Sequence, residues 1–131
     1  MNAVLIDTPL WQAYFRSGDG RLASAVAEAL EQGRAATCGI VVAELAADAA
    51  NAAAAATLAE ALRGLPHLAM TDDVFRCAGE LAIGLREAGA ALPLPRLLVA
   101  AAAIIHRVPL LAVDARLHAI TRLAPLNLLC V

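Results

Sequence analysis

The stretch Ala3-Val4-Leu5-Ile6-Asp7 opens the chain with four apolar residues that end on a carboxylate. Consecutive apolar residues leave no polar face, which predicts a fully buried strand. Asp7 then falls at the carboxyl end of that strand, the edge of an open parallel sheet where ligands bind. A carboxylate in such a place needs a cation or hydrogen-bond donors, because burying an unpaired charge is costly. Asp7 is therefore the first candidate site residue.

The composition bounds the class of protein. The 131 residues are 61% hydrophobic and 17% charged, which predicts one folded domain over residues 1–131 rather than a disordered chain. A net charge of -2 does not predict a broad basic surface for nucleic acid, so any contact with nucleic acid must be confined to a small part of the surface. The longest strongly apolar run, Leu97 to Ile105, is shorter than the roughly 20 residues that span a bilayer. We expect no membrane partner and no signal peptide.

The three cysteines, Cys38, Cys77 and Cys130, are odd in number and lack the spacing of a metal site. This pattern predicts reduced, mostly buried thiols in a cytoplasmic protein.

Two further strong strand candidates are also followed by acids. Ala36–Val42 runs into Glu44, expected in the first turn of the next helix, and Val108–Val113 ends at Asp114. Glu44 also has an ordinary structural explanation, because an acidic side chain near the N-terminus of a helix is stabilised by the helix dipole. Weaker strands are expected at 67–70 and 126–131.

Helical patterns separate these strands. The first helix is expected to begin at Thr8 and Pro9, and others are expected at residues 22–32, 51–63, 71–87, 95–106 and 115–122. This alternation predicts an α/β fold with a mainly parallel sheet of four or five strands. Trp11, Tyr14 and Phe15 follow at helical spacing, and they are interpreted either as an anchor for the first helix or as a partner-binding surface.

Several common catalytic arrangements are missing from the sequence. It has no glycine-rich phosphate loop and no Cys/His zinc pattern. His67, His106 and His118 fall at helix ends or loops, and no serine sits on a sharp strand–helix turn, so a Ser-His-Asp triad is not expected.

Four segments in order resemble a PIN domain, and most closely the VapC-type toxins of toxin–antitoxin pairs. They are "VLIDTPLWQAYFR", "TCGIVVAELAADA", "LREAGAALPLPRLLVAAAAIIH" and "VPLLAVDARLHAI", which together span nearly the whole chain. The resemblance implies a three-layer α/β/α fold and a metal-dependent endoribonuclease. It also implies an antitoxin partner and a homodimer.

The resemblance also assigns site residues. By motif, Asp7, Glu44 and Asp114 match acids of the catalytic site, and Asp7 and Asp114 would hold Mg²⁺ or Mn²⁺. The remaining acidic position of the motif is occupied by Arg96. Two smaller departures are Ala112, where a hydroxyl residue is common, and Ala47, where glycine is common.

Arg96 leaves three hypotheses open, because a guanidinium is permanently charged and carries five donors. In the first, it acts as a counter-ion that bridges Asp7 and Asp114 and weakens or removes the metal site. Alternatively, one metal still binds, or Arg96 swings outward and grips RNA phosphate. The function is therefore expected to be an RNA-cleaving toxin, with a PIN-like binding module without catalysis as the alternative. A third reading is a plain α/β domain in which the acids lie far apart.

Overall fold

The computed structural model describes residues 2–131, and within this range the strands form one five-stranded parallel sheet in the order β3-β2-β1-β4-β5. The strand at its centre, β1, is fully buried and pairs Leu5 with Ala36 of β2 and with Leu110 of β4. The strands are β1 (Val4–Ile6), β2 (Ala35–Cys38), β3 (His67–Leu68), β4 (Leu110–Ala112) and β5 (Leu128–Cys130).

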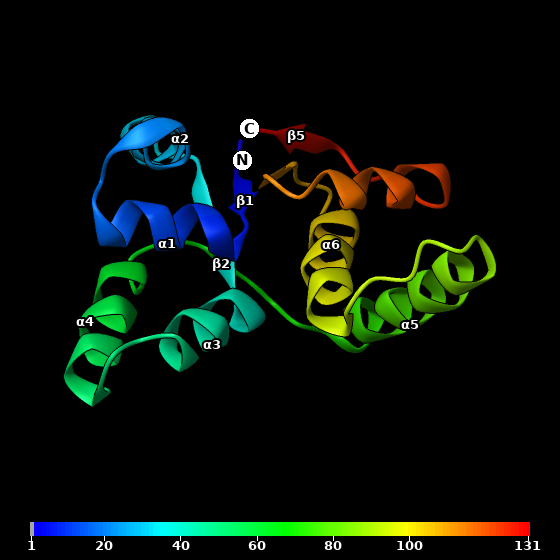
Figure 1. The fold of residues 1–131 in the computed structure, drawn as a ribbon, viewed down its shortest axis with the longest axis horizontal. Coiled ribbons are helices and arrows are strands. Elements are labelled where there is room, and N and C mark those ends of the chain that lie inside the picture. Colours follow the sequence, from blue (N-terminus) through cyan, green and yellow to red (C-terminus); the bar gives the residue numbers. More distant parts are fainter. Residues whose placement is uncertain (1) are drawn as a thin grey trace.

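Helices cover both faces of the sheet. Figure 1 shows α1, α2 and α4 on the left of the strands, α5 and α6 on the right, and α3 below them. The predicted three-layer α/β/α fold is confirmed. The helices are α1 (Thr8–Arg16), α2 (Gly20–Glu31), α3 (Gly39–Ala47), α4 (Ala52–Leu62), α5 (Asp72–Glu87), α6 (Leu94–His106) and the 3₁₀ helix η1 (Ala115–Arg122).

The helix α6 is the most deeply enclosed helix and carries Arg96 in its first turn. Every residue from Leu97 to Ala103 is buried, and the helix packs along α5. A helix that is apolar all round belongs inside a core. The alanine run from Ala100 to Ala103 suits this position, because small side chains let the helix lie close to its neighbours. The position of Arg96 is thus fixed by a rigid part of the fold.

The predicted strand at Ala36–Val42 is wrong in its second half. The strand β2 ends at Cys38 and α3 begins at Gly39, so Glu44 lies in the second turn of α3 rather than the first. A short apolar run fits a buried strand and a buried helix equally well, and here Val41 and Leu45 form the inward face of a helix. The other strands are shorter than predicted, and residues 115–122 form a 3₁₀ helix.

The aromatic trio is mainly an internal anchor. Trp11 is 1% exposed and stacks on Phe15 with ring centroids 5.7 Å apart, while Tyr14 and Phe15 are half-buried. This arrangement supports the anchor interpretation for Trp11 and leaves Phe15 available at the surface.

The expectation of mostly buried thiols holds only for Cys38, since Cys77 is half-buried and Cys130 is exposed. All three are free thiols, and burial raises the pKa of Cys38 and of Cys77 above the usual value. In the described part of the chain, no helix has both the length and the apolar character needed to cross a lipid bilayer.

Candidate active site

Asp7 lies at the carboxyl end of β1 and begins α1 as its N-cap residue. Its backbone N–H donates to the carbonyl of Leu111 at 3.0 Å, which holds it to the neighbouring strand. Its Oδ1 accepts a hydrogen bond from the backbone N–H of Thr8 at 2.8 Å. The side chain is 1% exposed, and its Oδ2 has no hydrogen-bond partner among residues 2–131. The chain therefore buries a carboxylate at the sheet edge with one oxygen unpaired.

Glu44 reaches the same place from α3. Its Oε1 accepts a hydrogen bond from Thr8 Oγ1 at 2.7 Å and another from Arg96 Nη2 at 2.5 Å. Its side chain is 32% exposed. Thr8 thus binds both acids, with its N–H to Asp7 and its hydroxyl to Glu44. This role of Thr8 was not predicted, although a hydroxyl residue directly after Asp7 was an available signal for it.

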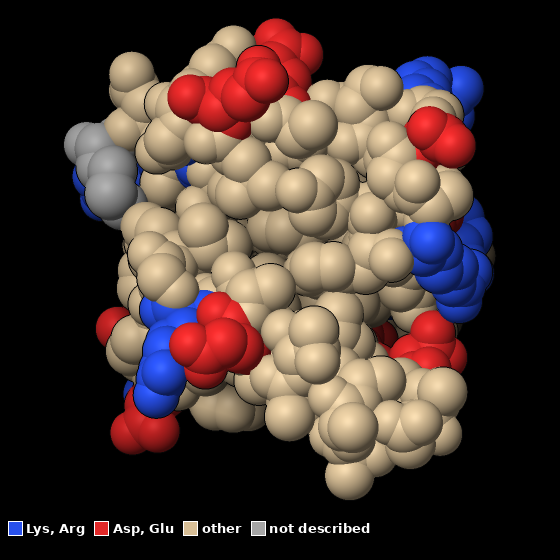
Figure 2. Space-filling model, turned by 90° about the vertical axis from the view of Figure 1, so that its left-hand side faces the viewer, with Lys and Arg blue, Asp and Glu red and all other residues tan. Residues whose placement is uncertain are grey.

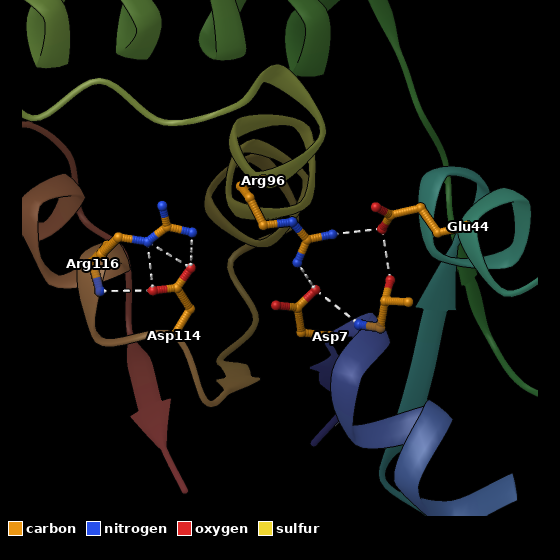
Figure 3. Close-up of polar contacts among 6 residues, drawn as sticks. Asp7, Glu44, Arg96, Asp114 and Arg116 are labelled. Atoms are coloured by element: carbon orange, nitrogen blue, oxygen red, sulfur yellow. Dashed lines mark hydrogen bonds and ion pairs between the residues drawn. The ribbon is translucent and has the colours of Figure 1, made fainter. Parts of the chain in front are cut away.

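Arg96 lies between the two acids, as Figure 3 shows. Its Nη1 donates to Asp7 Oδ1 while its Nη2 donates to Glu44 Oε1, and its side chain is 13% exposed. Burial acts to lower the pKa of Arg96, but the nearby carboxylates of Asp7 and then Glu44 raise it above the ordinary value. Arg96 is therefore a permanently charged partner for both acids.

Asp114 is paired elsewhere, although it lies on the other side of Asp7 in Figure 3. Arg116 Nε donates to Asp114 Oδ1 at 3.0 Å and Arg116 Nη2 donates to Oδ2 at 2.7 Å. Hydrogen bonding by Arg116 lowers the pKa of Asp114, and the charge of Arg96 adds a smaller effect in the same direction.

The prediction that Arg96 bridges Asp7 and Asp114 is therefore only half right. Arg96 does bind Asp7, but its second partner is Glu44 and not Asp114. The reason is local, since Arg116 follows Asp114 by two residues and also donates its backbone N–H to Asp114 Oδ1 at 3.0 Å. Arg116 was not among the predicted site residues, although the pattern Asp-x-Arg at the start of a helix was a usable signal for it.

Whether these acids fit Mg²⁺ or Mn²⁺ depends on which of their carboxylate oxygens are free. The unpaired, buried Oδ2 of Asp7 favours a cation. Against this, Asp7 Oδ1 and Glu44 Oε1 are both bound to Arg96, and both oxygens of Asp114 are bound to Arg116. Within residues 2–131 no group of three or more His, Cys, Asp or Glu side chains is arranged to hold a metal ion. As they lie, with Arg96 in place, these residues do not fit a divalent cation.

A parallel sheet with acids at the carboxyl ends of its strands defines a class of α/β proteins that place their chemistry at this edge. The PIN domain model matches residues 4–123, and the chain belongs to the PIN domain family. PIN domains of the toxin type are typically metal-dependent nucleases. No curated protein matches this sequence significantly.

Solved structures of toxin–antitoxin complexes are similar to this chain over nearly its whole length. The VapBC-5 structure from Mycobacterium tuberculosis is 26% identical with a TM-score of 0.72, and each chain is covered completely, at 100%. A VapBC2 structure from Rickettsia felis, bound to a promoter DNA fragment, is 18% identical with a TM-score of 0.77 and 98% of each chain covered. A toxin–antitoxin complex from Klebsiella pneumoniae is 21% identical with a TM-score of 0.73, covering 97% of this chain and 96% of that one. The resemblance to VapC-type toxins is confirmed.

Proposed function

We propose that this protein is the toxin of a toxin–antitoxin pair, a single-domain endoribonuclease that hydrolyses RNA phosphodiester bonds and is weakened by Arg96. The observation that carries the proposal is the meeting of Asp7 and Glu44 on one guanidinium at the sheet edge of a PIN fold. This meeting argues against a chance distribution of acids, because the two residues come from different elements. We place the protein in the cytoplasm, where it would encounter both RNA and the antitoxin.

In this proposal Asp7, Glu44 and Asp114 are the catalytic acids, with Mg²⁺ or Mn²⁺ as the cofactor held by Asp7 and Asp114. The two arginines occupy these carboxylates, so the acids are available only when Arg96 and Arg116 have moved away. The expected consequence is slow cleavage rather than the rate of a site with an acid at position 96.

A second candidate function is a PIN-like binding module without catalysis. The specific observation in its favour is that each candidate acid already has an arginine partner. Such a module would hold an antitoxin or sequester RNA without cutting it.

Cleavage of RNA with Mg²⁺, Mn²⁺ or EDTA by the purified protein separates these functions. We expect slow, cation-dependent cleavage by the wild type, none by Asp7→Asn, and faster cleavage by Arg96→Asp. Cleavage by Arg96→Asp alone would favour the binding module. Wild-type cleavage as fast as that of Arg96→Asp would contradict the weakening. Growth arrest on expression, relieved by Asp7→Ala, is the matching test in cells.

The antitoxin is proposed to dock in a groove of about 590 Å³ between α1, α3 and α4. Phe15, Leu45 and Leu58 line it together with alanines, and Arg16 and Asp48 form an ion pair at 3.3 Å among the lining residues. Leu62 is the only fully buried residue of α4, although the helix is largely alanine and leucine. Figure 2 shows that the side bearing α1, α2 and α4 is largely uncharged at its centre. An apolar segment of an antitoxin, with polar groups for the Arg16–Asp48 pair, suits this surface.

The protein is also proposed to form a homodimer. Phe75 and Ile83 on α5 are 54% and 50% exposed, which leaves large apolar side chains in water on the helix layer opposite the groove. A second copy of the chain would cover them.

A further inference from the structure

Arg96 binds one oxygen of each of the two carboxylates that a bridging cation would join. Its Nη1 and Nη2 donate to Asp7 Oδ1 and Glu44 Oε1, which belong to different elements of the fold. A divalent cation placed between these carboxylates would lie where the guanidinium lies, and the two positive charges would repel each other. The guanidinium and the cation therefore exclude each other.

The position of Arg96 in α6 is unfavourable for a cation on its own. It lies in the first turn, at the positive end of the helix, where acids are stabilising and cations are not. Pro93, the N-cap residue, offers no side-chain hydrogen bond, and the first turn contains no acid. The charge of Arg96 is thus stabilised by Asp7 and Glu44 rather than by its helix.

What remains for a cation is a poor ligand set. Asp114 is held by Arg116, and Asp7 Oδ2 is the buried carboxylate oxygen without a partner among residues 2–131. Glu44 Oε2 also accepts no hydrogen bond from residues 2–131. Both free oxygens, however, belong to carboxylates whose negative charge is already balanced by Arg96, which opposes the binding of Mg²⁺ or Mn²⁺.

We propose that Arg96 is a built-in counter-ion that takes the place of a divalent cation between Asp7 and Glu44, so that the folded protein holds this site closed to Mg²⁺ and Mn²⁺ while Arg96 is in place. Replacing Arg96 with an acid would convert the closed site into a cation site. The inference concerns cation binding alone, and it does not depend on whether the protein cleaves RNA.

The test is a Mn²⁺ titration followed by electron paramagnetic resonance, which reports free Mn²⁺ directly. We expect the wild type to leave the free-ion signal nearly unchanged, and Arg96→Asp to bind one Mn²⁺ at least about tenfold more tightly, because the substitution changes the local charge by two units. Mn²⁺ should also raise the melting temperature of Arg96→Asp and not that of the wild type.

Two controls locate the effect. Arg76→Asp makes the same change of charge at an exposed position on α5, where Arg76 pairs with Asp73, and should gain no Mn²⁺ binding. The double variant Asp7→Asn/Arg96→Asp should lose the binding that Arg96→Asp gained. Equal Mn²⁺ affinity of the wild type and Arg96→Asp would overturn the proposal, as would an equal gain in Arg76→Asp.

The wild-type measurement decides the case if Arg96→Asp does not fold. Binding of one Mn²⁺ by the wild type as tight as that of Arg96→Gln, and abolished in Asp7→Asn, would refute a closed site. No binding by the wild type, together with a gain in the milder variant Arg96→Gln, would support it.

Discussion

Arg96 and Asp7 are 89 residues apart in the chain, yet they form an ion pair in which the carboxylate is 1% exposed. The pair joins the first turn of α6 to the carboxyl end of β1. Removing one partner of a buried ion pair leaves an uncompensated buried charge, which costs far more than the pair contributes to stability. The contact should therefore dominate the response of this site to substitution.

Replacing Arg96 with methionine should lower the free energy of unfolding by about 3 kcal/mol, because the buried carboxylate of Asp7 loses its partner. The measurement is urea unfolding near neutral pH in EDTA. The matched control is Arg76→Met, whose exposed pair with Asp73 should contribute no more than about 0.5 kcal/mol. Equal losses in the two variants would show that the Arg96 pair is worth no more than a surface contact.

Thr8→Val should cost about 1 kcal/mol, because it removes the hydroxyl that donates to Glu44 Oε1 while keeping the shape of the side chain. Thr8 and Arg96 bind the same oxygen, so their effects should not add. A double-mutant cycle with Thr8→Val and Arg96→Met measures this coupling. Strictly additive losses would mean that the two contacts with Glu44 are independent.

Arg116→Ala should raise the pKa of Asp114 toward the ordinary value for aspartate, because its main cause of depression is the hydrogen bonding by Arg116. A depressed pKa in the folded state stabilises the protein above the unfolded pKa, and this contribution is lost as the pH falls through the folded pKa. Carbon-13 NMR of the Asp114 carboxyl group follows the titration in both proteins. Arg122→Ala, at the other end of η1, is the control and should leave the Asp114 curve in place.

The three cysteines should react with an alkylating reagent in the order Cys130, Cys77, Cys38. Cys130 is exposed, whereas burial keeps the pKa of Cys38 high and so keeps it in the unreactive thiol form. Mass spectrometry of time points taken at pH ~8 gives the order. In urea the three rates should converge, and rapid labelling of Cys38 in the folded protein would contradict its burial.

Phe75→Glu should convert the proposed homodimer to a monomer, because a charge would be buried at the interface. Analytical ultracentrifugation measures the change. Ile105→Glu, at the end of α6, introduces the same charge at a residue that is 38% exposed and should leave the dimer intact. A wild type that sediments as a monomer at high concentration would exclude the dimer.

The sequence allowed the sheet-edge position of Asp7 to be predicted because that position follows from local pattern. A buried strand followed by an acid, a proline and a helical repeat can be read without tertiary information, and so can the order of strands and helices. The alanine-rich helix containing Arg96 was also recognisable, and its observed start at Leu94 is within two residues of the prediction.

The pairing of Arg96 could not be predicted in the same way. Whether a long side chain meets Glu44 or Asp114 depends on how α3 and α6 pack against the sheet edge, and no local pattern encodes that packing. The helix start at Gly39 was missed for a related reason. A short apolar run becomes a strand or a helix according to the elements that pack over it.

The alanine run in α6 makes the geometry around Arg96 sensitive to changes made far from it. Ala100 to Ala103 are at most 1% exposed, so a larger side chain at any of them has no free space and must displace the helix axis. Such a displacement would carry the first turn with it and move the guanidinium relative to both carboxylates. Variation one or two turns along this helix can therefore retune the charge contacts at the sheet edge without touching a charged residue.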